Sequence, residues 1–291
     1  MGIRSWSAVL AGTSALLAGC ADPVPPGPRD VLTSTERSTL AGRAAGPPVL
    51  VAVVDGGIDP AHPALRGRVV RSWRAPGLTA GVSPHGTQVA GVVAGQPTGA
   101  WSGGLAGGAR LLDVQVLDRD GQGSAGDLAR GLRFAHAAGA DLVLTSLALD
   151  WDAPPVRSAV AALAGDGVPV VAAAGNGFDD LPAFPAAYAE VLGVGALDAG
   201  GRRQQLSGWT AADVVAPGEA VLAPVPGGGY SVVSGTSAAA AVAAGLLAAC
   251  GGTHSQAGGL RAAPWTSGSV EDAGRSRPRL TCPGHHDEGR R

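Results

Sequence analysis

The chain has 291 residues, of which 45% are apolar, and it carries a formal net charge of -2. This length allows one large or two modest domains with a buried core, and the near-neutral charge gives no electrostatic case for binding nucleic acid. The 47 glycines and 22 prolines accompany long apolar runs, so they indicate a globular protein with many tight turns.

The first 19 residues are typical of an export signal. Arg4 precedes the uncharged stretch AVLAGTSALLAG at residues 8–19, which is too short to span a bilayer but suits the apolar core of a signal peptide. The stretch leads into LAGC, which resembles the lipobox of bacterial lipoproteins. That resemblance implies that Cys20 is lipidated and that acyl chains anchor an extracytoplasmic protein to the cell envelope. An ordinary secretory signal that contains a cysteine is the alternative.

Residues 20–48 are rich in Pro, Gly, Ser, Thr and Arg and lack apolar periodicity, which indicates a flexible tether. Short, continuous apolar runs then alternate with helical patterns. Runs of this kind, without polar alternation, are typical of parallel strands that are covered on both faces. The runs are residues 49–55, 110–118, 141–149, 168–176 and 191–198, and the expected helices are 85–96, 124–139, about 155–166 and 237–250.

This alternation predicts an α/β fold for residues 49–250: a three-layer sandwich with a mostly parallel central sheet. Residues 251–291 are rich in Gly, Arg, Ser and Pro and are expected to form a loosely ordered tail. In parallel sheets, sites form at the carboxyl ends of strands, where Asp55 and Asn176 lie. Ser237 stands where the N-cap of the last helix is expected.

Four polar residues stand out, and each has an ordinary structural interpretation. Asp55 precedes two glycines, as turn residues often do. His85 opens a helix, Asn176 ends a strand, and Ser237 precedes an alanine-rich helix. Their appearance together, in the order Asp, His, Asn, Ser on an alternating α/β scaffold, indicates a catalytic site instead.

The strings around these residues are VVDGGID (53–59), HGTQVAG (85–91), VVAAAGN (170–176) and SGTSAA (234–239). They resemble those of the subtilases, the subtilisin-like serine proteases, and weaker similarity extends over residues 49–250. The resemblance implies a subtilisin-like fold, a serine endopeptidase with the triad Asp55, His85 and Ser237, and an oxyanion donor at Asn176.

These residue types suit acyl transfer. A serine is a weak nucleophile until a base removes its proton, and a histidine such as His85 titrates near neutral pH. A buried Asp55 would hold the imidazole in one tautomer and stabilise the imidazolium. The Asn176 amide and the Ser237 backbone N–H would then meet the oxyanion of the tetrahedral intermediate.

The resemblance also implies how a peptide or protein substrate lies. It would add as an extended strand between the edge segments GQGS (121–124) and TSLA (145–148). The residues assigned to substrate binding are Gly121, Gln122, Gly123, Ser146, Leu147 and Ala148 along these edges, and Ala173, Ala174 and Gly175 in one wall of the pocket for the side chain before the scissile bond. Ala148 replaces the family's usual glycine, which predicts a preference for small or modest apolar side chains there.

Two cysteines remain after Cys20. In an oxidising exterior Cys250 and Cys282 can form a disulfide, and two free thiols are the alternative. No cofactor or metal site is predicted: Ala64 stands where many subtilases have a calcium-binding Asp, and the ligand-type string CPGHHDE (282–288) lies in the tail. No pattern sets the oligomeric state.

Some positions depart from the subtilase pattern. Gly56 replaces the usual hydroxyl residue after the catalytic Asp, and Ala241 and Val242 replace the usual Pro and His. The tether is also too short for a folded pro-domain. These departures leave a second hypothesis open: a catalytically impaired scaffold of the same fold that binds extended peptides at the cell envelope.

Overall fold

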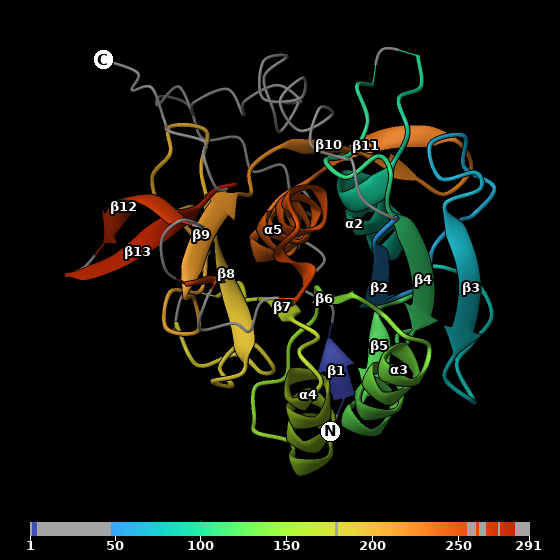
Figure 1. Ribbon diagram of the computed structural model, residues 1–291, viewed down its shortest axis with the longest axis horizontal. Helices are drawn as coiled ribbons and strands as arrows, with labels where there is room; N and C mark the ends of the chain where they lie inside the picture. Colours follow the sequence, from blue (N-terminus) through green and yellow to red (C-terminus); the bar gives the residue numbers. More distant parts are fainter. Residues whose placement is uncertain are drawn as a thin grey trace, which may run out of the picture.

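The computed structural model describes residues 2–4, 48–99, 101–177, 180–254, 260–261, 266–272 and 274–282. Its centre is a nine-stranded sheet in the order β12-β13-β9-β8-β7-β6-β2-β4-β3, flanked by helices (Figure 1). All neighbouring strands in this sheet are parallel except β12, which is antiparallel to β13. The predicted α/β fold with a mostly parallel sheet is confirmed.

The strands of this sheet are β2 (Leu50–Asp55), β3 (Val69–Arg74), β4 (Arg110–Gln115), β6 (Leu142–Thr145), β7 (Val170–Ala173), β8 (Val191–Leu197), β9 (Val214–Pro217), β12 (Thr266–Asp272) and β13 (Arg275–Leu280). The five predicted apolar runs contain β2, β4, β6, β7 and β8. Their residues are almost all buried because helices cover both faces of the sheet. The runs extend beyond the strands, and two of these extensions carry candidate site residues: Ser146 to Ala148 after β6 and Asn176 after β7.

The helices are α2 (Pro84–Ala94), α3 (Ala125–Ala137), α4 (Pro154–Gly165) and α5 (Thr236–Cys250), followed by a 3₁₀ turn at Gly252–His254. Helices α2 and α5 pack on one face of the sheet, and α3 and α4 pack on the other (Figure 1). Ser124 caps α3 as predicted, because its Oγ accepts a hydrogen bond from the Asp127 N–H at 3.0 Å. The prediction that Ser237 caps α5 is wrong: the cap is Gly235, and Ser237 lies inside the first turn.

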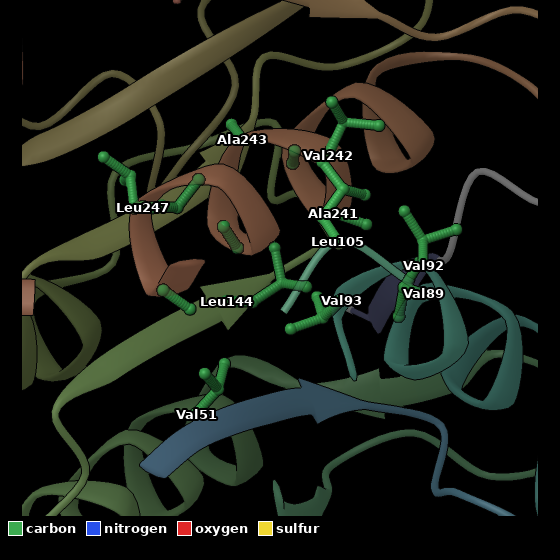
Figure 2. Close-up of a cluster of buried hydrophobic side chains, with 14 of the residues drawn as sticks. Val51, Val89, Val92, Val93, Leu105, Leu144, Ala241, Val242, Ala243 and Leu247 are labelled. Atoms are coloured by element: carbon green, nitrogen blue, oxygen red, sulfur yellow. The ribbon is translucent and has the colours of Figure 1, made fainter. Parts of the chain in front are cut away.

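Helix α5 runs through the core, and every residue from Thr236 to Gly245 is buried. Figure 2 shows Ala241 and Val242 of this helix in one apolar cluster with Val51 of β2 and Leu144 of β6. A helix buried on all sides needs small residues, because its neighbours approach closely on every face.

The C-terminal region differs from its prediction. Strands β12 and β13 form a hairpin, and β13 extends the central sheet beside β9, so the predicted loosely ordered tail is wrong for these residues. A disulfide joins Cys250 at the end of α5 to Cys282 after β13, with Cα atoms 5.8 Å apart. The folded domain therefore extends past the predicted boundary at residue 250, at least to Cys282.

Arginine side chains attach this hairpin to the rest of the sheet. Arg275 of β13 donates a hydrogen bond to Asp180 at 3.1 Å, and Arg203 donates to Asp272 of β12 at 2.6 Å. The carboxylate of Asp180 also accepts hydrogen bonds from the backbone N–H groups of Trp209 and Thr210. These bonds lower the pKa of Asp180 even though burial alone would raise it.

Two smaller sheets lie beside the main one. Strand β1 (Gly2–Arg4) pairs antiparallel with β5 (Gln122–Ser124), and β10 (Val221–Val225) pairs with β11 (Gly229–Val233). Apart from β1, the predicted signal peptide lies outside the described residues, as do Cys20 and nearly all of the tether. Within the described ranges, no helix has both the length and the apolar character needed to cross a bilayer.

Candidate active site

Asp55 and His85 form a buried pair. Asp55 is the last residue of central strand β2, and His85 lies in the first turn of α2, after Ser83 as N-cap and Pro84. His85 Nδ1 lies 2.9 Å from Asp55 Oδ2 and 3.0 Å from Oδ1, and the two residues are only 5% and 1% exposed. A proton on Nδ1 that is donated to Asp55 leaves Nε2 as the basic nitrogen.

The pKa of His85 is set by opposing effects. Burial of the ring lowers the pKa most, but the negative charge of Asp55 and its hydrogen bond together raise it by more than burial lowers it. The net pKa therefore lies above 6.5. A base with a raised pKa holds a transferred proton more firmly. The pair therefore favours the imidazolium form that acyl transfer requires as an intermediate.

A second buried carboxylate lies on the neighbouring strand. Asp113 of β4 pairs with Val53 of β2, two residues before Asp55. The pKa of Asp113 is raised to about 6: burial raises it most, hydrogen bonds from Ser72 and the Ile58 backbone lower it, and the charge of Asp55 raises it. One oxygen of Asp113, Oδ1, is buried without a hydrogen-bond partner within the described residues. No motif in the sequence marks this residue.

Ser237 is brought near the sheet by α5, and it is 2% exposed. Its Oγ donates a hydrogen bond to the Ser146 carbonyl oxygen at 3.1 Å, and Ser146 Oγ lies 3.4 Å from the Ser237 carbonyl oxygen. His85 Nε2 is buried and has no hydrogen-bond partner in the described part of the chain. The serine hydroxyl is thus directed at Ser146, and it must leave that carbonyl before it can donate to His85.

Asn176 lies in the loop after β7 and is oriented by Thr236. Its Oδ1 accepts hydrogen bonds from the Thr236 N–H at 2.9 Å and from the Thr236 hydroxyl at 3.1 Å. The oxygen end of the amide is therefore engaged, which leaves the NH₂ end as the available donor. Gly235 fits the close approach, because a Cβ there would lie 2.9 Å from Asn176 Oδ1 and its φ of 103° suits glycine.

The N-terminus of α5 adds further donors. The first N–H groups of a helix have no acceptor within it, and the helix dipole favours negative charge at this end. Ser237 occupies this first turn, next to the residue that holds the Asn176 amide. The geometry suits an oxyanion near the Ser237 side chain. Thr236, which sequence reasoning missed as an orienting residue, lies within the SGTS string.

The predicted substrate edge at Gly121, Gln122 and Gly123 coincides with β5 and the turn before it. Strand β1 pairs antiparallel with β5, with Ile3 opposite Gly123, so this edge accepts an extended segment. The other predicted edge, Ser146 to Ala148, follows β6 and is buried. In the chain β5 follows β4 and residues 146–148 follow β6, and β4 and β6 lie on either side of β2 in the central sheet.

The predicted pocket wall begins at Ala173, the last residue of β7, and continues with Ala174 and Gly175. Gly175 has a φ of 95°, and a Cβ built on it would lie 3.0 Å from the Cβ of Ala183. Ala183 is therefore a further residue against this wall, and no motif in the sequence marks it. Ala148 and Ala183 are both nearly fully buried, which limits the space available.

Two other histidines have clear structural roles. His62, whose His-Pro context predicts a structural residue, accepts at Nδ1 from the Ala64 N–H at 3.0 Å, and its Nε2 lies 3.0 Å from the Gly229 carbonyl oxygen. His136 pairs with Asp166 at the surface. Among the described residues there is no group of three or more His, Cys, Asp or Glu placed to hold a metal ion. Residues 283–288 of the CPGHHDE string lie outside them.

Comparison with known proteins gives consistent similarities. A model of the subtilase family matches residues 46–254. The thermophilic serine proteinase of Bacillus sp. strain AK1 is 36% identical over 203 residues, which are 68% of this chain and 51% of that protein. Subtilisin BL of Lederbergia lenta is 37% identical over 206 residues, 70% of this chain and 76% of the other. The chain thus spans about half the length of the first of these relatives.

Solved structures agree with this similarity. The crystal structure of a cold adapted subtilisin-like serine proteinase matches with a TM-score of 0.71 and 26% identity. The match covers 82% of this chain and 89% of that one. The similarity therefore extends over most of the described sheet and helices.

Proposed function

Because the chain belongs to the subtilase family, we propose that it is a serine endopeptidase in which Ser237 attacks the peptide bond and His85 takes its proton. The observation that carries the proposal is the buried Asp55–His85 pair, in which Nδ1 is engaged and Nε2 has no partner among the described residues. In a histidine held in this way, Nε2 makes no structural hydrogen bond and can act as the base.

The reaction then follows from these positions. The Ser237 hydroxyl leaves the Ser146 carbonyl, gives its proton to His85 Nε2, and its oxygen bonds to the carbonyl carbon of the substrate. The Asn176 NH₂ group and the Ser237 backbone N–H stabilise the oxyanion. His85 then gives the proton to the leaving amine, and water hydrolyses the acyl-enzyme by the same steps.

We infer that the substrate is an extended peptide. The pairing of β5 with β1, an extended strand of this chain, supports this, because a substrate strand would use the same kind of backbone hydrogen bonds. The buried methyl groups of Ala148 and Ala183 favour small or modest apolar side chains before the scissile bond. Faster cleavage after Phe than after Ala would contradict this preference, and Ala148→Gly should raise the rate for Phe substrates selectively.

We also propose that the protein is extracytoplasmic and anchored through lipid on Cys20. The LAGC string supports lipidation, and the Cys250–Cys282 disulfide is typical of an oxidising compartment. Cys20→Ala should leave unlipidated or mislocalised protein. Unchanged membrane association in that variant would contradict the anchor.

Fluorophosphonate labelling tests the catalytic proposal directly. The purified protein should be labelled at Ser237, and Ser237→Ala should not be labelled although it folds. The hydrogen bond from Ser237 to Ser146 favours the second candidate, an impaired peptide-binding scaffold, because it engages the hydroxyl proton with an acceptor other than His85. Folded protein that binds peptides but is never labelled would establish the scaffold instead.

A further inference from the structure

Gly56 and Ser83 lie against each other beside the Asp55–His85 pair. The Ser83 N–H donates to the Gly56 carbonyl oxygen at 2.8 Å, and the Gly56 N–H donates to Asp55 Oδ1 at 2.7 Å. Ser83 Oγ accepts from the His85 N–H at 3.3 Å and caps α2. Hydrogen bonds therefore connect Asp55 to Gly56, Gly56 to Ser83 and Ser83 to His85, and the Asp55–His85 bond closes the ring.

The space at this contact holds only one side chain. A Cβ built on Gly56 would lie 2.5 Å from the Cβ of Ser83, closer than two carbon atoms approach without a bond. The same Cβ would lie 3.3 Å from Ser83 Oγ, which is also a tight contact, and 3.6 Å from the Asp118 carbonyl oxygen, which is an ordinary one. Gly56 is not among the residues with positive φ, so its backbone admits other residues. Ser83 alone excludes a side chain at position 56.

We propose that Ser83 is a positioning residue for His85 and that its side chain occupies the space left by glycine at position 56. Positions 56 and 83 act as one unit: there is room for a side chain at one of them, but not at both. Ser83 is 5% exposed, so the contact is fixed by packing. It sets the distance from the end of β2 to the start of α2, and with it the Asp55–His85 hydrogen bond. The proposal rests on the proposed function for its kinetic readout only.

The test is a double-mutant cycle with Gly56→Ala, Ser83→Gly and both changes together. Gly56→Ala forces the 2.5 Å contact and should lower kcat/KM about 10- to 100-fold, because misplacement of a catalytic pair by a fraction of an ångström is costly. Ser83→Gly removes the cap oxygen and should cost only a few-fold. The double variant should match Ser83→Gly, because the methyl group added at position 56 then meets only the Asp118 carbonyl oxygen, at an ordinary distance.

Two controls separate packing from other effects. Ser83→Ala keeps the Cβ and removes only the hydroxyl, so Gly56→Ala should remain as damaging in that background as in the parent. Gly126→Ala in α3, where a Cβ makes no contact closer than 3.6 Å, should leave kcat/KM unchanged. Independent, multiplicative effects of the two changes, or normal activity in Gly56→Ala, would overturn the proposal.

A second readout needs no turnover. In the Ser237→Ala background, an NMR titration should give a His85 pKa above 6.5 that falls in Gly56→Ala and returns when Ser83→Gly is added. If the protein proves to have no peptidase activity, this titration still decides the positioning role. If Gly56→Ala does not fold, the double variant should restore folding; failure to do so would also overturn the proposal.

Discussion

Replacing Asn176 tests one observed and one proposed role of the same amide. Its Oδ1 accepts two hydrogen bonds from the fully buried Thr236, while its NH₂ group is the proposed oxyanion donor. Asn176→Ala removes both. Asn176→Asp keeps an acceptor for Thr236 and replaces the donor with a charge that repels an oxyanion. The two variants should therefore differ in stability and agree in their loss of catalysis.

The magnitudes follow from these contacts. Asn176→Ala leaves the buried Thr236 N–H without an acceptor, which costs about 1–3 kcal/mol and lowers the Tm by roughly 3–10 °C. Loss of one oxyanion donor lowers kcat by about 10²- to 10³-fold, the range known from loss of the corresponding donor in subtilisin. Asn176→Asp should lose at least as much kcat while its Tm stays near that of the parent.

Peptide hydrolysis at pH 8 and thermal unfolding of both variants measure these effects, with Ser237→Ala as the inactive, folded control. An Asn176→Asp variant that keeps a third or more of the parental kcat would refute the donor role. Equal losses of Tm in the Ala and Asp variants would refute the orienting role of Thr236.

Three further predictions concern pH and packing. Because catalysis needs neutral His85, whose pKa is raised, kcat/KM should increase with pH through a midpoint above 6.5, and a midpoint at or below 6.5 would contradict the effect of the pair. The pKa of Asp113 is raised from 3.8 to about 6, so ionisation of this carboxyl increasingly opposes folding between about pH 4 and pH 6. Asp113→Asn should therefore stabilise the protein by up to about 3 kcal/mol at pH 8 and by well under about 1 kcal/mol at pH 4, as measured by urea unfolding. Gly91→Ala should cost about 1–3 kcal/mol, because its Cβ would lie 2.1 Å from Pro224 Cγ; similar losses in the uncrowded Gly126→Ala would show that packing is not the cause.

The sequence predicts the centre of the fold well and its borders poorly. Buried parallel strands such as β7 require continuous apolar runs, which are visible without any knowledge of neighbours. β3 and β13 carry exposed polar side chains, with sequences VVRSWR and RSRPRL, so no run marks them. They are strands because they pair with β4 and β9, a condition set by residues far away in the chain.

The same distinction holds at the site. Motif strings identify Asp55, His85, Asn176 and Ser237, because acyl transfer requires those residue types. The direction of each functional atom depends on partners that no local pattern names. The Ser237 hydroxyl meets a carbonyl 91 residues away in the chain, and the Asn176 amide is turned by a residue 60 positions away.

The C-terminal hairpin has a consequence for the order in which the site is completed. A chain is synthesised from its N-terminus, so β12, β13 and Cys282 are the last described parts to become available. Arg275 supports Asp180, four residues after Asn176, only once this hairpin is in place. All four proposed catalytic residues are thus made before the segment that completes their sheet. This order delays completion of the site until the residues as far as Cys282 have been synthesised.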